Sequence, residues 1–203
     1  MKILRLITSF KGKESQSYQL GSAILDKLKT EYTEIHVRER NLAENEMPHL
    51  NGVHFTSFIT PPENLSAEQR KALSLSDGAI KELVEADAVI MEVPMYNFTI
   101  PSSLKAWIDH VVRAGVTFRY TENGVEGLVK GKKVFLAIAS GGVYSEGPMK
   151  GYDFTERYLR NILGFIGITD ITTFRVEGSA IPGLRDTALP KALESVAAYV
   201  SSF

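Results

Sequence analysis

Apolar residues along the chain fall into five short runs separated by longer stretches with helical spacing. The short runs are β-branched or alternate apolar with polar residues, as strands do. We therefore predict strands over residues 2–8, 33–38, 88–93, 133–140 and 168–176. The intervening apolar spacing predicts helices over about residues 15–28, 67–85, 101–113, 155–163 and 189–200.

Two of these helices carry clear starting signals. Ser66 and Gln69 are spaced as the two partners of a capping box, which predicts that a helix begins directly after Ser66. Pro101 suits the first turn of the next helix, because the proline N–H is not needed there. An apolar stripe on that helix is interpreted as core or subunit interface; its members are Leu104, Trp107, Ile108 and Val111.

Regular alternation of strand and helix is the pattern of a parallel sheet covered on both faces. We predict a single α/β domain over residues 1–203, with a doubly wound five-stranded parallel sheet in the order 2-1-3-4-5. Residues 41–62 break the alternation with two histidines, three prolines and scattered apolar residues. We interpret them as a long connection that is functional or packs against a partner.

Composition narrows the possible chemistry. The chain has 203 residues, 44% of them apolar, and a net charge of -1, so neither nucleic acid nor an anionic membrane is expected as its partner. With no cysteine, disulfides and thiolate chemistry are excluded, and redox chemistry requires a borrowed cofactor. No run approaches the ~20 apolar residues of a membrane span, and no signal segment is evident, so we expect a cytoplasmic protein.

Three segments that follow predicted strands could hold a ligand. After the first strand, Ser9, Ser15 and Ser17 precede or begin a helix, where backbone N–H groups favour a phosphate. An ordinary helix cap explains the same serines equally well. No Gly-x-Gly-x-x-Gly follows this strand, and residues 127–133 do not fit a Walker A loop, so a dinucleotide or nucleoside triphosphate held in those ways is disfavoured.

The third and fourth strands lead into segments suited to a flat ring. Residues 94–101 supply aromatic groups, an amide and two prolines at the carboxyl end of the sheet. Gly141 and Gly142 follow the fourth strand and would let the backbone approach a planar ligand, although a flexible turn is an equal alternative. We expect these two segments and the serine segment to converge on one ligand.

Other candidate sites are weaker. Phe118 and Tyr120 would share one face of an extended run and could cover a flat substrate, although such alternation is more common in cores. The four histidines are dispersed, so no metal site is expected. There is no Gly-x-Ser-x-Gly nucleophile elbow of a serine hydrolase.

Taken together, these segments resemble the FMN-dependent NADH-azoreductases, which are flavodoxin-like quinone reductases. The resemblance covers essentially the whole chain, and its most specific part combines Pro-Met-Tyr-Asn-Phe at residues 94–98 with Ala-Gly-Val-Thr-Phe-Arg-Tyr at residues 114–120. It implies a flavodoxin-like homodimer with one FMN per subunit, bound at or near the subunit interface. One departure is Ala139-Ser140, where some members of that family carry Ser-Arg.

The resemblance also implies roles for individual residues. Those that would hold the FMN phosphate are Ser9, Ser15, Gln16 and Ser17. Those that would border the flavin ring are Met95, Tyr96, Asn97, Phe98, Ala139, Ser140, Gly141 and Gly142. Those that would contact nicotinamide or substrate are Asn97, Phe118, Tyr120 and Phe165.

The function implied is an oxidoreductase in which NADH delivers hydride to flavin N5, leaves, and is replaced by a quinone or an azo compound. The cofactor would carry the bond chemistry, so no catalytic acid–base pair is required. Two alternatives stay open: a non-catalytic electron carrier of flavodoxin type, and a reductase of free flavin or nitroaromatic compounds.

Overall fold

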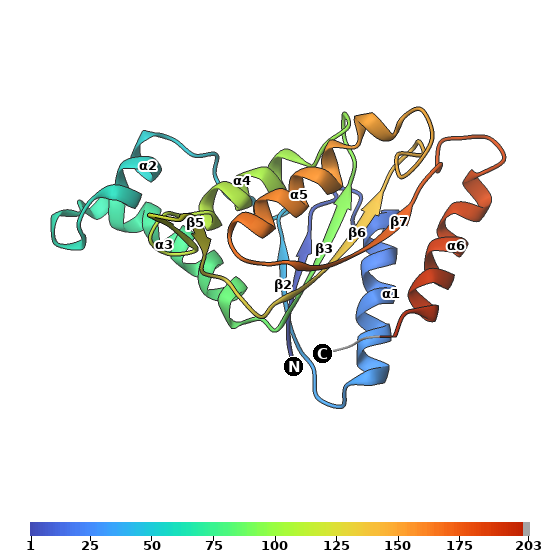
Figure 1. Ribbon diagram of the computed structural model, residues 1–203, viewed down its shortest axis with the longest axis horizontal. Coiled ribbons are helices and arrows are strands. Elements are labelled where there is room, and N and C mark those ends of the chain that lie inside the picture. The colour runs from blue at the N-terminus through green and yellow to red at the C-terminus, as the bar shows by residue number, and fades with distance from the viewer. Residues whose placement is uncertain (201–203) are drawn as a thin grey trace.

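Five parallel strands form the centre of the molecule, shown in Figure 1 as a computed structural model in which residues 1–200 are described. They are β1 (Lys2–Ile7), β2 (His36–Asn41), β3 (Ala88–Pro94), β6 (Lys133–Ala139) and β7 (Asp170–Val176). Their order is β2-β1-β3-β6-β7, and every neighbouring pair is parallel. Counted within the sheet this is 2-1-3-4-5, so the predicted flavodoxin-like α/β fold is confirmed.

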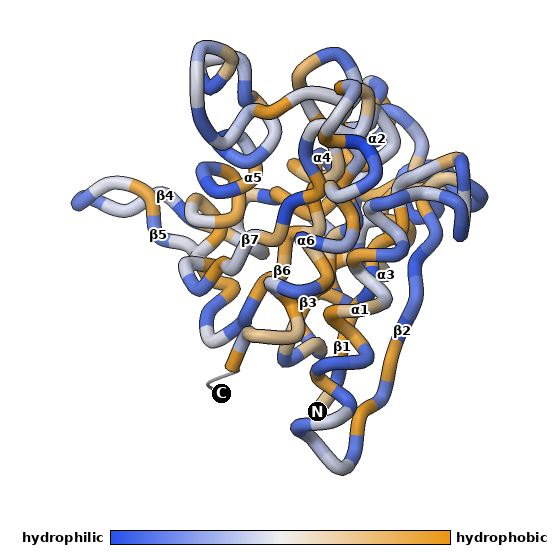
Figure 2. Tube along the Cα trace, turned by 90° about the vertical axis from the view of Figure 1, so that its right-hand side faces the viewer, coloured by the Kyte–Doolittle hydropathy of each residue, from blue (hydrophilic) through white to orange (hydrophobic). Residues whose placement is uncertain are grey.

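Helices cover both faces of the sheet. One face packs against α1 (Gln16–Glu31) and α6 (Arg185–Ala198), and the other against α3 (Ala67–Glu85), α4 (Ser102–Val111) and α5 (Phe154–Phe165). Successive strand residues point to opposite faces, so Leu4 joins the core under α3 and α4 whereas Ile3 joins the core under α1. The inner strands are apolar in Figure 2, while β2 at the edge is largely hydrophilic.

The α4 stripe lies in the core. Trp107 and Leu104 are fully buried with their apolar neighbours, so the stripe is unavailable to a partner. The predicted start of α3 is confirmed as well, because Ser66 accepts from the Gln69 N–H at 3.1 Å and Gln69 accepts from the Ser66 N–H at 2.9 Å.

Several element boundaries differ from the prediction. Strand β2 spans residues 36–41 and not 33–38, because residues 36–41 are the ones that pair with β1, the polar run 38–41 included. The segment 41–62, expected to be a long connection, contains helix α2 (Gly52–Ile59), which is capped by Asn51. Helix α6 begins at Arg185 and contains Pro190, which the prediction had placed in its first turn.

Short elements complete the chain. Strands β4 (Phe118–Thr121) and β5 (Gly124–Gly127) form an antiparallel hairpin outside the main sheet. The hairpin packs back on the end of α5, where a Cβ on Gly127 would lie 2.2 Å from the Gly167 nitrogen. Within residues 1–200, single 3-10 turns are found at η1 (Gly12–Glu14), η2 (Pro62–Asn64) and η3 (Lys150–Tyr152).

Candidate functional site

A cleft of about 450 Å³ opens at the carboxyl ends of β1, β3 and β6. It lies where ligands bind in doubly wound sheets, next to the strands at which the order reverses. Sequence-predicted residues that line it are Ser9, Ser15, Gln16, Met95, Tyr96, Ala139, Ser140 and Gly141. The three segments expected to converge therefore do meet in one cavity.

The first wall is the start of α1, which lacks a side-chain cap. Ser15 occupies the cap position, yet its hydroxyl pairs with the Ser17 hydroxyl at 2.9 Å and makes no capping hydrogen bond. By contrast, α2, α3 and α5 are capped by Asn51, Ser66 and Asp153. The first N–H groups of α1 are therefore left as donors for an anion, which an ordinary cap would have satisfied.

The second wall is a tight turn after β3. Tyr96 and Thr99 exchange backbone hydrogen bonds at 3.0 and 3.1 Å, and the two residues between them have positive φ. These are Asn97 at 48° and Phe98 at 69°. An aromatic residue in the left-handed region is strained, and such strain concentrates at functional sites. The N–H groups of Asn97 and Phe98 donate no hydrogen bond within residues 1–200.

The third wall is the segment after β6, whose first three carbonyl groups all accept hydrogen bonds from the segment after β7. Oxygens of Ser140, Gly141 and Gly142 accept from N–H groups of residues 178–180 at 3.0 to 3.3 Å. The N–H groups of Gly141 and Gly142 make no hydrogen bond in the described part of the chain. Met95 N donates to Ala139 O at 2.8 Å, and this hydrogen bond connects the second wall to the third. The unpaired N–H groups of both walls are therefore available to a ligand.

Sequence reasoning missed part of the cleft lining. Ser179 and Arg185 come from the segment after β7, and the rule that ligands bind at carboxyl ends of strands could have indicated them. Lys11 and Glu14 also line the cleft. Neither Lys11 nor Arg185 forms an ion pair or a side-chain hydrogen bond within residues 1–200, so both charges are available to an anion. Phe10, also missed, stacks on Tyr96 with ring centroids 5.2 Å apart.

Four predicted cofactor residues lie beside the cleft and do not line it: Ser17, Asn97, Phe98 and Gly142. Ser17 is fully buried behind Ser15. Phe98 is 41% exposed and contacts the rings of Tyr144 and Tyr152, which sequence reasoning did not identify. Phe98, Gly142 and Tyr144 form the rim between the second and third walls.

The aromatic residues predicted to contact substrate, Phe118, Tyr120 and Phe165, cluster away from the cleft. Phe118 contacts Phe165 and Tyr120 with ring centroids 4.5 and 5.6 Å apart, so the expected side-by-side placement of Phe118 and Tyr120 is observed. Phe118 lines a separate cavity of about 300 Å³ over α2, α4 and α5. Within one chain, the aromatic cluster and the cleft are therefore apart.

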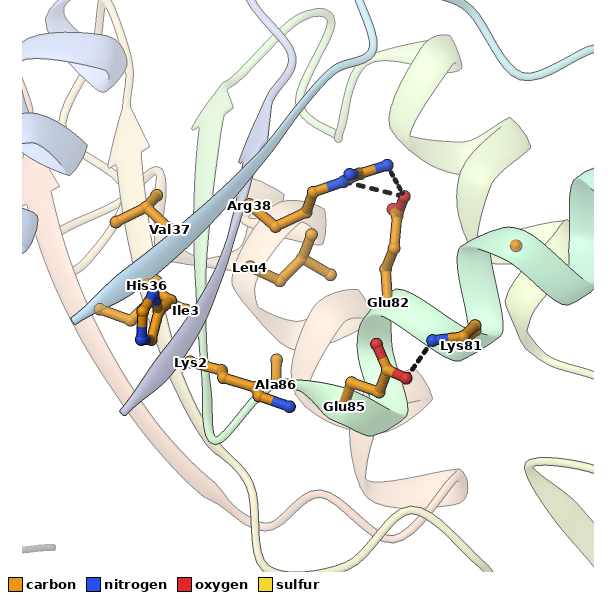
Figure 3. A pocket seen from close by; sticks show the side chains of 11 residues that line it. Lys2, Ile3, Leu4, His36, Val37, Arg38, Lys81, Glu82, Glu85 and Ala86 are labelled. Atoms are coloured by element: carbon orange, nitrogen blue, oxygen red, sulfur yellow. Dashed lines mark hydrogen bonds and ion pairs between the residues drawn. The ribbon is translucent and has the colours of Figure 1, made fainter. Parts of the chain in front are cut away.

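A cavity of similar size, about 470 Å³, lies at the opposite end of the sheet (Figure 3). It is bounded by the amino ends of β1 and β2 and by the last turns of α3. Arg38 pairs with Glu82 at 2.9 Å across it, and Lys81 pairs with Glu85. Both of its carboxylates are already paired with cations, and the strand carboxyl ends face away from it, so we assign the site to the three-walled cleft.

Beneath α1, hydrogen bonds from the buried Arg5 connect the sheet to the first wall. Arg5 donates from Nε to Glu92 Oε1 at 2.6 Å and from Nη2 to Ser22 Oγ of α1 at 2.7 Å. Burial raises the pKa of Glu92 to about 8, although Arg5 acts against the rise. A Cβ on Gly21 would lie 2.4 Å from Glu92 Oε1, so only glycine fits where α1 crosses this carboxyl.

Two classes of site have no support in the part of the chain described. Residues 1–200 contain no cluster of three or more histidine, cysteine or acidic side chains arranged to hold a metal ion. Over the same range, no helix has the length and apolar character needed to cross a membrane.

Comparison with known proteins agrees with this geometry. Residues 1–200 match a family model described as having a flavodoxin-like fold. An FMN-dependent NADH:quinone oxidoreductase of Herminiimonas arsenicoxydans is 47% identical over 89% of this chain and 88% of its own, and one of Beijerinckia indica is 42% identical over 98% of both. An azoreductase structure from Bacillus anthracis superposes with a TM-score of 0.90 at 32% identity, over 97% of both chains. The chain belongs to the flavodoxin-like family of FMN-dependent NADH:quinone oxidoreductases.

Proposed function

We propose that this protein is an FMN-dependent NADH:quinone oxidoreductase. The observation that carries the proposal is the convergence of three strand-end segments, with unused backbone donors, on one cleft in a chain related to enzymes of that name. The rest of the site is consistent with a phosphate at one end of the cleft and a flat ring at the other.

The first wall fits the FMN phosphate. An uncapped helix start offers N–H groups and the positive end of the helix dipole, and Ser9 and Ser15 add hydroxyl donors. The free cationic groups of Lys11 and Arg185 suit a phosphate dianion more than a neutral ligand. Gln16 lines the same wall, and Ser17 supports the Ser15 hydroxyl from behind.

The second and third walls fit the ring. N–H groups of Asn97 and Phe98 on one side, and of Gly141 and Gly142 on the other, are donors without partners among residues 1–200. Directed at the polar edge of a flavin, they would stabilise the negative charge that the ring gains on reduction. Met95 and Tyr96 supply the flat apolar surface between these donors.

When held by the three walls of the cleft, FMN would supply the hydride chemistry that carries electrons from NADH to a quinone, and we propose a ping-pong order in which NAD⁺ leaves before the quinone binds. The chain's own residues would bind and orient the reactants and need not transfer a proton themselves. A flat slot over a flavin discriminates little between planar conjugated acceptors, so we propose azo compounds as a second class of substrate.

A second copy of the chain would complete the substrate side of the site. The cavity containing Phe118 shares Tyr158 with a neighbouring cavity at Thr99 and Phe154, so one groove runs along α5 toward the rim at Phe98. Phe55 and Ile59 of α2 line this groove and are 60% and 69% exposed. We propose that this apolar face is covered by an identical subunit, whose own Phe118, Tyr120 and Phe165 would then approach the cleft.

The test is NADH oxidation by purified protein with FMN and benzoquinone, and with no other reductase. Steady turnover supports the proposal, and repeating the assay with an aromatic azo dye tests the second substrate class. Failure to oxidise NADH while FMN is bound would favour the electron carrier. FMN that leaves the protein during turnover and appears in solution in its reduced form would favour the free-flavin reductase.

A further inference from the structure

The segment that follows β7 holds the third wall of the cleft in place. Its backbone N–H groups at residues 178–180 bind the carbonyl groups of residues 140–142, as described above. The Ser179 hydroxyl adds a second hydrogen bond to Ser140 O at 3.0 Å. These bonds fix the direction in which the Gly141 and Gly142 N–H groups point.

Glu177 extends this contact to the next residues of the wall. Its Oε1 accepts from the backbone N–H of Tyr144 at 2.7 Å and from that of Ser145 at 2.8 Å, and its Oε2 accepts from the Ser145 hydroxyl. Its side chain is only 13% exposed. A carboxylate that receives two successive backbone N–H groups fixes both position and direction of that backbone.

Arg175 connects Glu177, which binds the beginning of the loop 144–153, to Asp153 at the end of that loop. The guanidinium lies 3.3 Å from Glu177 Oε1 and also pairs with Asp153 and Glu156 at the start of α5. Burial disfavours the charge of Glu156, but hydrogen bonds from Arg175, Thr173 and Arg160 outweigh it and lower the pKa of Glu156 to about 2. Both ends of the loop 144–153 are thus anchored at the carboxyl end of β7, the beginning by Glu177 and the end by Arg175.

The anchored loop places an aromatic ring over the wall. A Cβ on Gly142 would lie 3.0 to 3.2 Å from the ring of Tyr144, so this ring covers Gly142 directly. The same ring meets Phe98 edge-on, with centroids 6.1 Å apart. Tyr144 therefore bridges the second and third walls at the rim of the cleft.

We propose that Glu177 is a positioning residue: it holds the 140–145 backbone so that the glycine N–H groups face the flavin ring and Tyr144 closes the rim beside it. This role rests on the proposed function, since it assigns the ring end of the cleft to FMN. Glu177 acts through the loop and does not line the cleft itself. Because it lies at the ring end and not at the phosphate end, its loss should affect flavins with and without a phosphate alike.

The test compares FMN and riboflavin binding in full-length variants, followed by quenching of flavin fluorescence. For Glu177→Ala we expect the Kd of both flavins to rise on the order of tenfold, since the loop loses the three hydrogen bonds by which Tyr144 and Ser145 are held to the carboxylate. Glu177→Gln keeps an acceptor oxygen and should recover most of that loss. Glu126→Ala is the control, because Glu126 forms surface ion pairs with Arg119 and Lys130 on the hairpin.

A change in the visible spectrum of bound FMN provides the second measurement. We expect the bands of bound FMN to shift toward those of free FMN in Glu177→Ala, whereas Glu126→Ala should leave them unchanged. If Glu177→Ala does not fold, Ser145→Ala is the substitute, because it removes one hydrogen bond to Glu177 and keeps the two backbone bonds. We expect a smaller loss of both affinities for it.

The proposal is overturned if the folded variants bind both flavins like the wild type, or if only FMN binding weakens. The second outcome would place Glu177 at the phosphate end. Wild-type protein that binds neither flavin would instead refute the proposed function itself. Wild-type binding with unaffected variants refutes the positioning role alone.

Discussion

The serine at the start of α1 differs from an ordinary helix cap in one respect. Ser66 caps α3 with a hydrogen bond to Gln69 N, whereas the Ser15 hydroxyl turns to Ser17 and leaves the α1 N–H groups free. The sequence admits both interpretations equally, because serine is favoured at helix starts with or without a ligand. The conformation of Ser15 is what favours an anion site.

The first prediction compares these two serines. Ser15→Ala should weaken FMN binding about tenfold, because a hydrogen bond to a charged phosphate is lost, and it should change riboflavin binding little. Ser66→Ala should instead cost about 1 kcal/mol of unfolding free energy and leave FMN affinity intact. Flavin titration and denaturant unfolding of the flavin-free proteins measure both. A Ser15→Ala variant that loses stability and retains its FMN affinity would make Ser15 an ordinary cap.

The second prediction concerns the strained turn at Phe98. Phe98→Gly creates Asn-Gly, the pair preferred where both central residues of a turn have positive φ. Relief of about 1 kcal/mol of strain should offset the lost ring contacts, so the Tm should stay equal or rise by a few degrees. Flavin affinity should fall, because the ring leaves the rim.

Phe10→Gly is the matched control for that turn, because Phe10 is also exposed and has no positive φ. It should destabilise the protein, since glycine adds backbone freedom without relieving strain. Thermal unfolding followed by circular dichroism compares the two variants. A loss of stability in Phe98→Gly as large as in Phe10→Gly would show that the turn stores no strain.

At the scale of elements, the largely apolar contact between α1 and the sheet includes one buried carboxyl. Glu92 on β3 faces Arg5 of β1, Glu39 of β2 and the backbone of Gly21 in α1. Burial raises its folded pKa to about 8, while the unfolded carboxyl ionises near 4.5. The folded state therefore binds more protons than the unfolded state between these values.

The third prediction follows from this difference in proton binding. As the pH rises from about 5 to 8, Glu92 should lower the free energy of unfolding, with a slope of at most about 1.4 kcal/mol per pH unit. Glu92→Gln should remove that contribution, whereas Glu85→Gln, at an exposed position on α3, should keep it. Urea unfolding at several pH values measures the slopes. Equal slopes for wild type and Glu92→Gln would mean that Glu92 is ionised throughout.

The elements predicted best are those whose local signals agree with their packing. Helix α3 was placed correctly because Ser66 and Gln69 mark its start and its apolar residues face the core. Strand β2 was misplaced because it lies at an edge, where its residues are mostly exposed and hydrophobic periodicity carries little information. Helix α2 was missed because it is short and its contacts are non-local, including the ring of His54 against that of His110.

The candidate site was predictable to the extent that strand ends fix it. Gly141 and Met95 could be placed because their strands were recognised and the carboxyl ends of parallel strands meet at one edge. The position of Tyr144 could not be predicted, because it is fixed by contacts between residues distant in sequence. The Tyr144 contact with Phe98 and the Glu177 hydrogen bond to Tyr144 N are of this kind.

For the whole molecule, the most informative surface is the exposed apolar face around α2 and α5, which we propose a second copy covers. The fourth prediction is that the wild type dimerises and that Ile59→Glu stays monomeric at the same concentrations, because the substitution would place a charge in the groove that we propose a second copy covers. Quinone reduction should fall, since the aromatic residues of the second copy are removed. Sedimentation velocity and the NADH assay measure the two effects.

The control for this prediction is Val84→Glu, at an exposed apolar position of α3 outside the groove. It should leave both association and turnover unchanged. A wild type that is monomeric at all concentrations, yet fully active, would show that the site is complete within one chain.

The central claim is that one cleft, formed by the ends of β1, β3 and β6, binds one FMN. Titration of flavin-free protein with FMN, monitored by visible absorbance, tests it most directly. We predict saturation at one FMN per chain, with tighter binding of FMN than of riboflavin and marked weakening of FMN binding in the Ser9→Ala, Ser15→Ala double variant, which loses both hydroxyl donors of the first wall. Absence of uptake, or equal FMN affinity in that variant, would contradict the account.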